Sequence, residues 1–193
     1  MGGAHRAEGA EGAEGTTEPS ALDSALLVVR HKSARYSVEH PLALGAALGG
    51  ADRELEDRLR AVGLPLGEAF QLRDDELGVF GSPEVTGKPA GDDLREGKRT
   101  ALLAITLDRL DRAGDAGDRV RALVGRPDLG VAEVDEVRAL MRDSGALDAH
   151  EDLVAQRREA GMSALAALDA ARLPRGARGA LTELAGLLTT RTS

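Results

Sequence analysis

The chain has 193 residues, enough for one domain with a hydrophobic core, and its 42% apolar and 30% charged content is ordinary for a globular protein. The absence of cysteine excludes disulfides and thiolate metal sites and fits a cytoplasmic location, while the net charge of −8 disfavours nonspecific binding to nucleic acid or to an anionic membrane. No apolar run approaches the roughly 20 residues that cross a bilayer, so we expect no membrane span.

Residues 1–20 contain three Ala-Glu-Gly triplets and no apolar periodicity, so we expect a flexible, low-complexity tail. This segment also lacks the apolar stretch of a secretory signal. We expect residues 21–193 to form one helical domain. Its first helix should begin at Ala21, because Ser20 is a good N-cap and Asp23 places an acid in the first turn.

A second helix is expected to begin at Pro41, because proline suits the first helical position. A long amphipathic helix should follow and run toward Asp75, with Pro65 kinking or interrupting it. The apolar residues of this long helix recur at spacings of three and four, and they are Leu55, Leu59, Val62, Leu66 and Ala69.

Glycine, proline, serine and aspartate dominate residues 78–97, which predicts a loop. Helical texture resumes at Lys98, and no later segment sustains the alternation of a β-strand. Further helices are expected at residues 117–124, 131–143, 147–172 and 176–190. Since Ala, Leu, Arg and Glu also dominate the composition, the sequence predicts an all-α fold.

Three polar side chains share one face of the long helix near its end. Gln71, Asp74 and Asp75 lie at positions i, i+3 and i+4. Two adjacent carboxylates repel each other unless a cation or water compensates them. Hard oxygen ligands of this kind suit Mg²⁺, which usually binds one or two carboxylates together with substrate phosphates. Asp92 and Asp93, beyond the Gly-rich loop, could fold back and complete the same metal shell.

Lysine is rare in this chain. Of 25 basic residues only Lys32, Lys88 and Lys98 are lysine, and all three lie in or upstream of the Gly-rich acidic region. Lysine offers phosphate a compact point charge, and the helix that starts near Lys98 adds a partly positive N-terminus. The pattern favours a site for magnesium and phosphate.

Simpler interpretations compete with this one. An Asp-Asp pair is often only a solvated helix face. Gly97-Lys98 resembles a phosphate-binding P-loop only faintly, because the spacing from Gly91 is one residue too long and Arg99 stands in the Ser/Thr position. An EF-hand is unsupported, because alternating oxygen ligands do not follow Asp74.

The stretch GEAFQLRDDELGVFGSPEVTGKPAGDDLREGKRT, at residues 67–100, resembles the second aspartate-rich region of the trans-isoprenyl diphosphate synthases, the polyprenyl synthetase family. That region has the form F-Q-x-x-D-D-x-x-D, then G-K, then G-x-D-L-x-x-G-K-x-T. Upstream, KSARYSVEHPLALGAAL resembles the family's K-T-A-x-Y segment, with Ser33 in place of threonine. Downstream, GALDAHEDLVAQRREAGMSALAAL resembles its C-terminal helices. The likeness extends over about residues 22–191 and implies an isoprenoid-synthase-type helical bundle.

The resemblance implies a prenyltransferase of isoprenoid biosynthesis. Such an enzyme condenses an allylic diphosphate with isopentenyl diphosphate and uses Mg²⁺ as its cofactor. By resemblance, Asp74 and Asp93 would ligate Mg²⁺ directly, and Asp75 would support the water shell of the metal.

The resemblance also implies catalytic roles for Lys32, Ser33, Gln71 and Lys88. Lys32, Lys88 and Lys98 would hold the diphosphate. The dipoles of Ser33 and Gln71 would lie near the reacting end of the substrate, where they could guide proton loss or stabilise the cation.

Two departures from the family pattern affect these expectations. Gly78 stands where the family has the last acid of D-D-x-x-D, so one outer ligand is absent. No first aspartate-rich motif and no G-G-K-R segment precede the second region, so we expect an incomplete bundle without the family's N-terminal helices. The leading hypothesis is the C-terminal half of a synthase that needs a separately encoded N-terminal half or an earlier start codon.

Two alternatives accompany this hypothesis: a noncatalytic partner that regulates a full-length synthase, and a truncated, inactive remnant. A helical protein partner is expected, whether it is the missing half, a full-length synthase or a second copy, because a half-domain exposes apolar helix faces. A terpene cyclase is disfavoured, because GKPAGDDLREGKRT is typical of chain elongation.

Overall fold

The computed structural model describes residues 18–83, 87, 89, 91–114, 116–169 and 172–189. Within these ranges every regular element is a helix, which confirms the all-α prediction. The helices are α1 (Ala21–Val28), η1 (Val29–Glu39), α2 (His40–Leu48), α3 (Arg53–Phe80), α5 (Asp92–Glu96), α6 (Ala101–Ala113), α7 (Gly117–Leu123), α8 (Val131–Asp143), α9 (Ala146–Ala166) and α10 (Ala177–Thr189). None of them is both long and apolar enough to cross a membrane.

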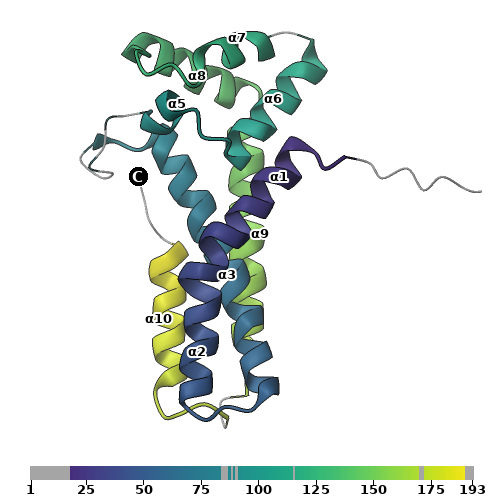
Figure 1. The fold of residues 1–193 in the computed structure, drawn as a ribbon, viewed down its shortest axis with the longest axis vertical. Helices are drawn as coiled ribbons and strands as arrows, with labels where there is room; N and C mark the ends of the chain where they lie inside the picture. The colour runs from purple at the N-terminus through teal and green to yellow at the C-terminus, as the bar shows by residue number, and fades with distance from the viewer. Residues whose placement is uncertain are drawn as a thin grey trace, which may run out of the picture.

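The two longest helices, α3 and α9, pack side by side along most of the molecule (Figure 1). The lower parts of α3 and α9 are flanked by α2 and α10, while α6, α7 and α8 gather at the upper end. Buried apolar residues of α3 form the stripe that the sequence predicts, and each is at most 8% exposed: Leu55, Leu59, Val62, Leu66 and Ala69. The helix period therefore places the core correctly.

The first helix begins as its capping residues predict. The Ser20 hydroxyl accepts a hydrogen bond from the Asp23 backbone N–H, and the Asp23 carboxylate accepts one from the Ser20 backbone N–H. This capping box satisfies two donors that a helix otherwise leaves unpaired at its start. The predicted tail lies outside the described residues, apart from residues 18–20.

Helix η1 is a π-helix, and it joins α1 and α2 into one continuous helical rod. The His40 backbone N–H bonds to the carbonyl of Arg35, five residues earlier. The wider turn relieves the clash of a proline ring with the carbonyl four residues before it. The α-helix α2 begins at His40 and has Pro41 in its first turn, close to the predicted start, although it continues from η1 without a break.

Pro65 lies inside α3 and does not interrupt it. Proline removes one backbone hydrogen bond, and the burial of the flanking residues on both packed sides of α3 outweighs that loss. The helices α7, α8 and α10 lie within one residue of their predicted bounds. Helix α9 begins as predicted but ends at Ala166 rather than at residue 172. The short helix α5 forms within the segment predicted as a loop.

A buried carboxylate ties three helices together just below the candidate site. Glu68 of α3 is 4% exposed and lies 2.7 Å from Arg30 Nε of η1 and 2.8 Å from Arg157 Nε of α9. His150 of α9 is fully buried, and its Nε2 lies 3.0 Å from the carbonyl of Leu72. Burial lowers the pKa of His150, which favours the neutral ring.

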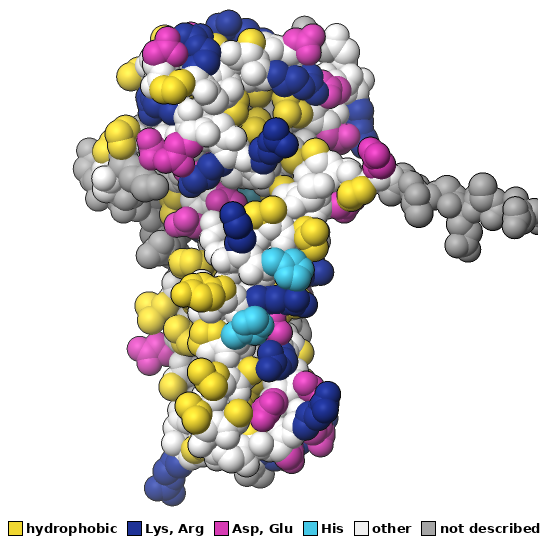
Figure 2. Space-filling view, in the orientation of Figure 1, with side chains coloured by type: hydrophobic (Ala, Val, Ile, Leu, Met, Phe, Trp, Pro, Cys, Tyr) yellow, Lys and Arg dark blue, Asp and Glu magenta, His cyan; other side chains and the backbone are white. Residues whose placement is uncertain are grey.

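One face of the helical rod exposes a series of large apolar side chains, which we call the apolar stripe. Figure 2 shows hydrophobic side chains gathered over η1 and α2 on the face turned to the viewer. The members of the stripe are between 53% and 81% exposed: Leu27, Val28, Tyr36, Leu44 and Leu48. Contiguous exposed patches of this kind are uncommon on monomeric globular proteins.

At Gly67 the backbones of η1 and α3 approach closely. A Cβ atom at Gly67 would lie 2.8 Å from Ala34 Cα and 2.9 Å from Ala34 O. We therefore expect Gly67→Ala to lower the free energy of unfolding by about 1–3 kcal/mol, because backbone atoms must move apart. Urea denaturation measures this change.

The matched control is Gly179→Ala in α10, where an added Cβ meets nothing within 4 Å. It should stabilise the protein by about 0.5–1 kcal/mol, since alanine favours a helix over glycine. Equal stability of Gly67→Ala and the wild type would contradict the close packing of η1 on α3.

Candidate active site

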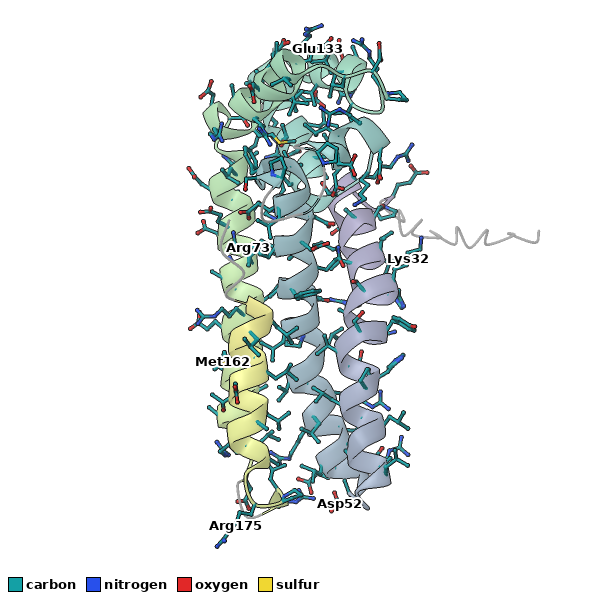
Figure 3. All side chains as sticks on the ribbon, turned by 90° about the vertical axis from the view of Figure 1, so that its left-hand side faces the viewer. Lys32, Asp52, Arg73, Glu133, Met162 and Arg175 are labelled. Atoms are coloured by element: carbon teal, nitrogen blue, oxygen red, sulfur yellow. The ribbon has the colours of Figure 1, made fainter. Side chains whose placement is uncertain are left out.

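A cavity of about 350 Å³ lies where the helical rod, α3 and the start of α6 meet. Five residues predicted from the sequence line it together: Lys32, Ser33, Gln71, Asp75 and Lys98. The remaining lining residues are Ala25, Val28, Val29, Arg99 and Thr100. In Figure 3, Lys32 lies on the η1 side of α3, whereas Arg73 lies on the α9 side. Residues about 40 positions apart in sequence therefore share one cavity.

A hydrogen-bonded relay fixes the polar side chains of the cavity wall. The Ser33 hydroxyl donates to Gln71 Oε1, and Gln71 Nε2 donates to Asp75 Oδ1 at 2.9 Å. Gln71 and Asp75 are one turn apart on α3, so they point the same way. With both ends bonded, the amide has one orientation, and its dipole is fixed relative to the cavity.

Asp75 lies in an environment that disfavours its charged form. Asp75 is only 7% exposed, and burial raises the pKa of its carboxyl group to about 6. The Gln71 hydrogen bond and the Lys98 charge lower the pKa, while the carboxylates of Asp93 and Asp74 raise it. A cation placed among these carboxylates would relieve the repulsion.

Asp93 and Lys98 form an ion pair at the turn between α5 and α6. Asp93 is 4% exposed, and Lys98 Nζ lies 2.5 Å from its Oδ1. Burial lowers the pKa of Lys98, but the hydrogen bond and charge of Asp93, with Glu96 and Asp75, outweigh this and raise it. The turn needs glycine at Gly97, whose φ is +68°. The ammonium group therefore stays charged at the edge of the cavity.

Two described residues of the predicted metal site do not line the cavity: Asp74 is exposed on α3, and Asp93 lies buried in α5 beside Lys98. Lys88 lies outside the described residues. In the part of the chain that the structure describes, no three His, Asp or Glu side chains are grouped so that they could hold a metal ion. The donor atoms that do converge are hard oxygens, which suit Mg²⁺ better than a softer metal.

Two cavity residues were not singled out as site candidates from the sequence. Arg99 and Thr100 line the cavity and also a second, adjoining cavity of about 830 Å³ between α1, α6 and α7. Thr100 is the N-cap of α6, where its hydroxyl accepts from the Leu103 N–H. Their signal was their place directly after Lys98, in the run Gly-Lys-Arg-Thr.

Comparison with known proteins assigns the family. The polyprenyl synthetase family model matches residues 3–141, so the chain belongs to the polyprenyl synthetase family. This match begins within the segment predicted as a tail and ends before the C-terminal helices. The resemblance inferred from the sequence is thereby confirmed at the level of the family.

Relatives of known activity are similar over part of their length. The chain is 39% identical over 111 residues to the geranylfarnesyl diphosphate synthase of Aeropyrum pernix, and this match covers 58% of the chain and 33% of the relative. It is 40% identical over 121 residues to the (2E,6E)-farnesyl diphosphate synthase of Mycobacterium tuberculosis, and this match covers 62% of the chain and 33% of the relative. The chain thus matches about a third of the length of these curated relatives.

Solved structures confirm the isoprenoid-synthase-type helical fold. The crystal structure of geranylgeranyl pyrophosphate synthase from Corynebacterium glutamicum, complexed with isoprenyl diphosphate and magnesium, superposes with a TM-score of 0.82 at 41% identity. The superposition covers 89% of this chain and 47% of that chain. A polyprenyl synthase from Caulobacter crescentus, complexed with calcium and isoprenyl diphosphate, gives 0.71 at 36% identity and covers 87% and 49%.

Proposed function

We propose that this chain forms one wall of the active site of an isoprenyl diphosphate synthase. The reaction is the head-to-tail condensation of an allylic diphosphate with isopentenyl diphosphate, and we place it in the cytoplasm. One observation carries the proposal: five residues that match the family's motifs line one cavity, with carboxylate, amide, hydroxyl and ammonium groups together. This set suits a diphosphate bound through a divalent cation.

Asp74 and Asp93 are proposed as the direct ligands of Mg²⁺, and Asp75 as the acceptor that orders its water shell. When bound, Mg²⁺ neutralises the charge that develops on the leaving diphosphate. The raised pKa of Asp75 supports this role, because its carboxylate faces two others in a buried environment.

The lysines of this wall are proposed to hold the diphosphate. Lys32 lines the cavity from η1, and Lys98 lines it from the turn between α5 and α6. Lys88 is proposed as the third lysine that binds the diphosphate. As the carbon–oxygen bond of the allylic substrate breaks, the electron pair leaves with the diphosphate, and ammonium groups stabilise that charge.

Ser33 and Gln71 are proposed to act at the carbon end of the substrate. The alkene of isopentenyl diphosphate attacks the allylic cation, a carbon–carbon bond forms, and a proton is then lost. The relay from Ser33 through Gln71 to Asp75 holds the amide in one orientation. A fixed dipole stabilises a nearby cation without reorganising during the reaction.

We propose that a helical segment outside the printed sequence, or a second helical chain, completes the site. The apolar stripe supports this, because five large side chains of one helical rod face solvent and Val28 also borders the cavity. A partner packed there would bury apolar surface and shield the site from water.

Magnesium-dependent binding of an allylic diphosphate analogue tests the site. Calorimetry should show binding by the full chain, and Asp74→Ala should weaken it about 10- to 100-fold, since a metal ligand is lost. The control is Asp118→Ala, because Asp118 is a fully exposed acid of α7. Equal affinity of Asp74→Ala and the wild type would contradict the metal assignment.

The apolar stripe also favours a second candidate function, a noncatalytic partner that regulates an intact synthase. Capture of interacting proteins from the native host separates the two. If the chain is half of a split enzyme, the captured protein should be a complementary half with its own acidic motif. If the chain is a regulator, the captured protein should be a full-length synthase.

A further inference from the structure

Gly78 of α3 faces the carboxylate of Asp93 directly. A Cβ atom at Gly78 would overlap Asp93 Oδ2 and Cγ and would lie 2.9 Å from Oδ1. Gly78 follows Asp74 and Asp75 by one helical turn, on the face that carries these acids. The volume that any other side chain would fill at position 78 is therefore occupied by a carboxylate from α5.

We infer that Gly78 is a positioning residue, which admits the Asp93 carboxylate to the acidic face of α3. The inference rests on the proposed function for its consequence in ligand binding, although the packing itself does not. The position where the family's motif has a third acid thus keeps a carboxylate nearby, brought from another helix. Position 78 itself contributes no ligand, and the space of its side chain holds the Asp93 carboxylate.

Asp93 is held firmly in this place. It is 4% exposed, and its Oδ1 lies 2.5 Å from Lys98 Nζ. The backbone N–H of Lys98 also bonds to the Asp93 carbonyl at 3.1 Å, which closes the turn after α5. A side chain at position 78 would have to displace Asp93 from Lys98 or push α5 away from α3.

The turns that flank α5 leave it little freedom to retreat. Gly91 and Gly97, at its two ends, have φ values of +74° and +68°. A Cβ at Gly91 would collide with Val134 of α8, and one at Gly97 would lie 3.0 Å from Gly125 Cα. Because α5 is bounded by backbone and core on its outer side, the contact with Gly78 decides where Asp93 sits.

Binding of inorganic pyrophosphate in the presence of Mg²⁺, measured by calorimetry on the full chain, tests this role. Gly78→Ala should weaken binding about ten-fold or more, because the Asp93–Lys98 pair is displaced. Its melting temperature should fall by roughly 2–6 °C. Gly179→Ala, with nothing within 4 Å of the added Cβ, should bind pyrophosphate like the wild type.

Moving the carboxylate from α5 to α3 separates a charge requirement from simple packing. The double variant Gly78→Asp with Asp93→Ala places the acid on α3 and should recover binding to within about three-fold of the wild type. The neutral variant Gly78→Asn with Asp93→Ala fills the same volume and should recover the melting temperature without recovering binding.

The outcomes separate this inference from the proposed function. Wild-type binding by Gly78→Ala overturns the positioning role, as does equal binding by the two double variants. If the wild type itself binds no pyrophosphate, the proposed function fails, and the melting temperatures still decide the packing. A Gly78→Ala variant as stable as Gly179→Ala would then overturn the inference.

Discussion

Lys98→Ala is expected to weaken Mg²⁺-dependent pyrophosphate binding by about 10- to 100-fold, the effect of losing a charge-assisted contact to phosphate. Lys98 lines the cavity, and its pKa is raised by the neighbouring acids, so its ammonium group is fully charged at neutral pH. The substitution also leaves the buried Asp93 carboxylate without its cation. Calorimetric titration of the full chain measures the loss.

Two further variants make this result specific. Lys98→Arg should lose less affinity than Lys98→Ala, because it keeps the charge but replaces a compact donor by a wider, planar one. Arg158→Ala, in α9, is the control, because Arg158 does not line the cavity. Unchanged binding by Lys98→Ala would place the diphosphate elsewhere.

Asp75→Asn is expected to stabilise the metal-free protein at neutral pH by about 2–3 kcal/mol and to have little effect at pH 4. Burial raises the pKa of Asp75 from 3.8 to about 6, so the folded protein disfavours the charged carboxylate. Only well below pH 3.8 is the group protonated in both folded and unfolded chains, so that no penalty remains. The penalty grows as the pH rises from about 4 to about 6 and is constant above.

Urea denaturation at several pH values between 4 and 7.5, without divalent cations, measures this profile. Asp118→Asn is the control, since that side chain is fully exposed and its ion pair with Arg121 lies on the surface, so the difference should stay small at every pH. Saturating Mg²⁺ should reduce the advantage of Asp75→Asn, because a bound cation stabilises the charged form. A pH-independent difference would contradict the assignment of the penalty to Asp75.

The period of apolar residues was sufficient to predict most of the fold. The buried apolar face of α3 and the positions of the later helices follow from spacing alone, because burial on one face dominates the stability of these helices. Two effects of proline depended on tertiary structure. Pro65 does not interrupt α3, because packing on both sides of α3 outweighs the lost hydrogen bond, and the helix before Pro41 continues into α2 through the wider turn of η1. No local residue pattern announces a π-helix.

The candidate site was predictable in part. Spacing placed Gln71, Asp74 and Asp75 on one helix face, and the scarcity of lysine singled out Lys32. Only the family resemblance added Ser33, which is some 40 residues away in sequence. The contact between Gly78 and Asp93 depends on where α5 packs, and spacing carries no such information.

The π-helical segment changes the direction in which side chains of α2 point relative to side chains of α1. An α-helix turns about 100° per residue, so Tyr36, nine residues after Leu27, would point to the opposite side. A π-helix turns about 80° per residue, which brings Tyr36 and Leu44 round to the side of Leu27. Deleting one residue of η1 after Lys32 would therefore rotate the exposed leucines of α2 relative to Lys32, even though no hydrophobic side chain had been removed.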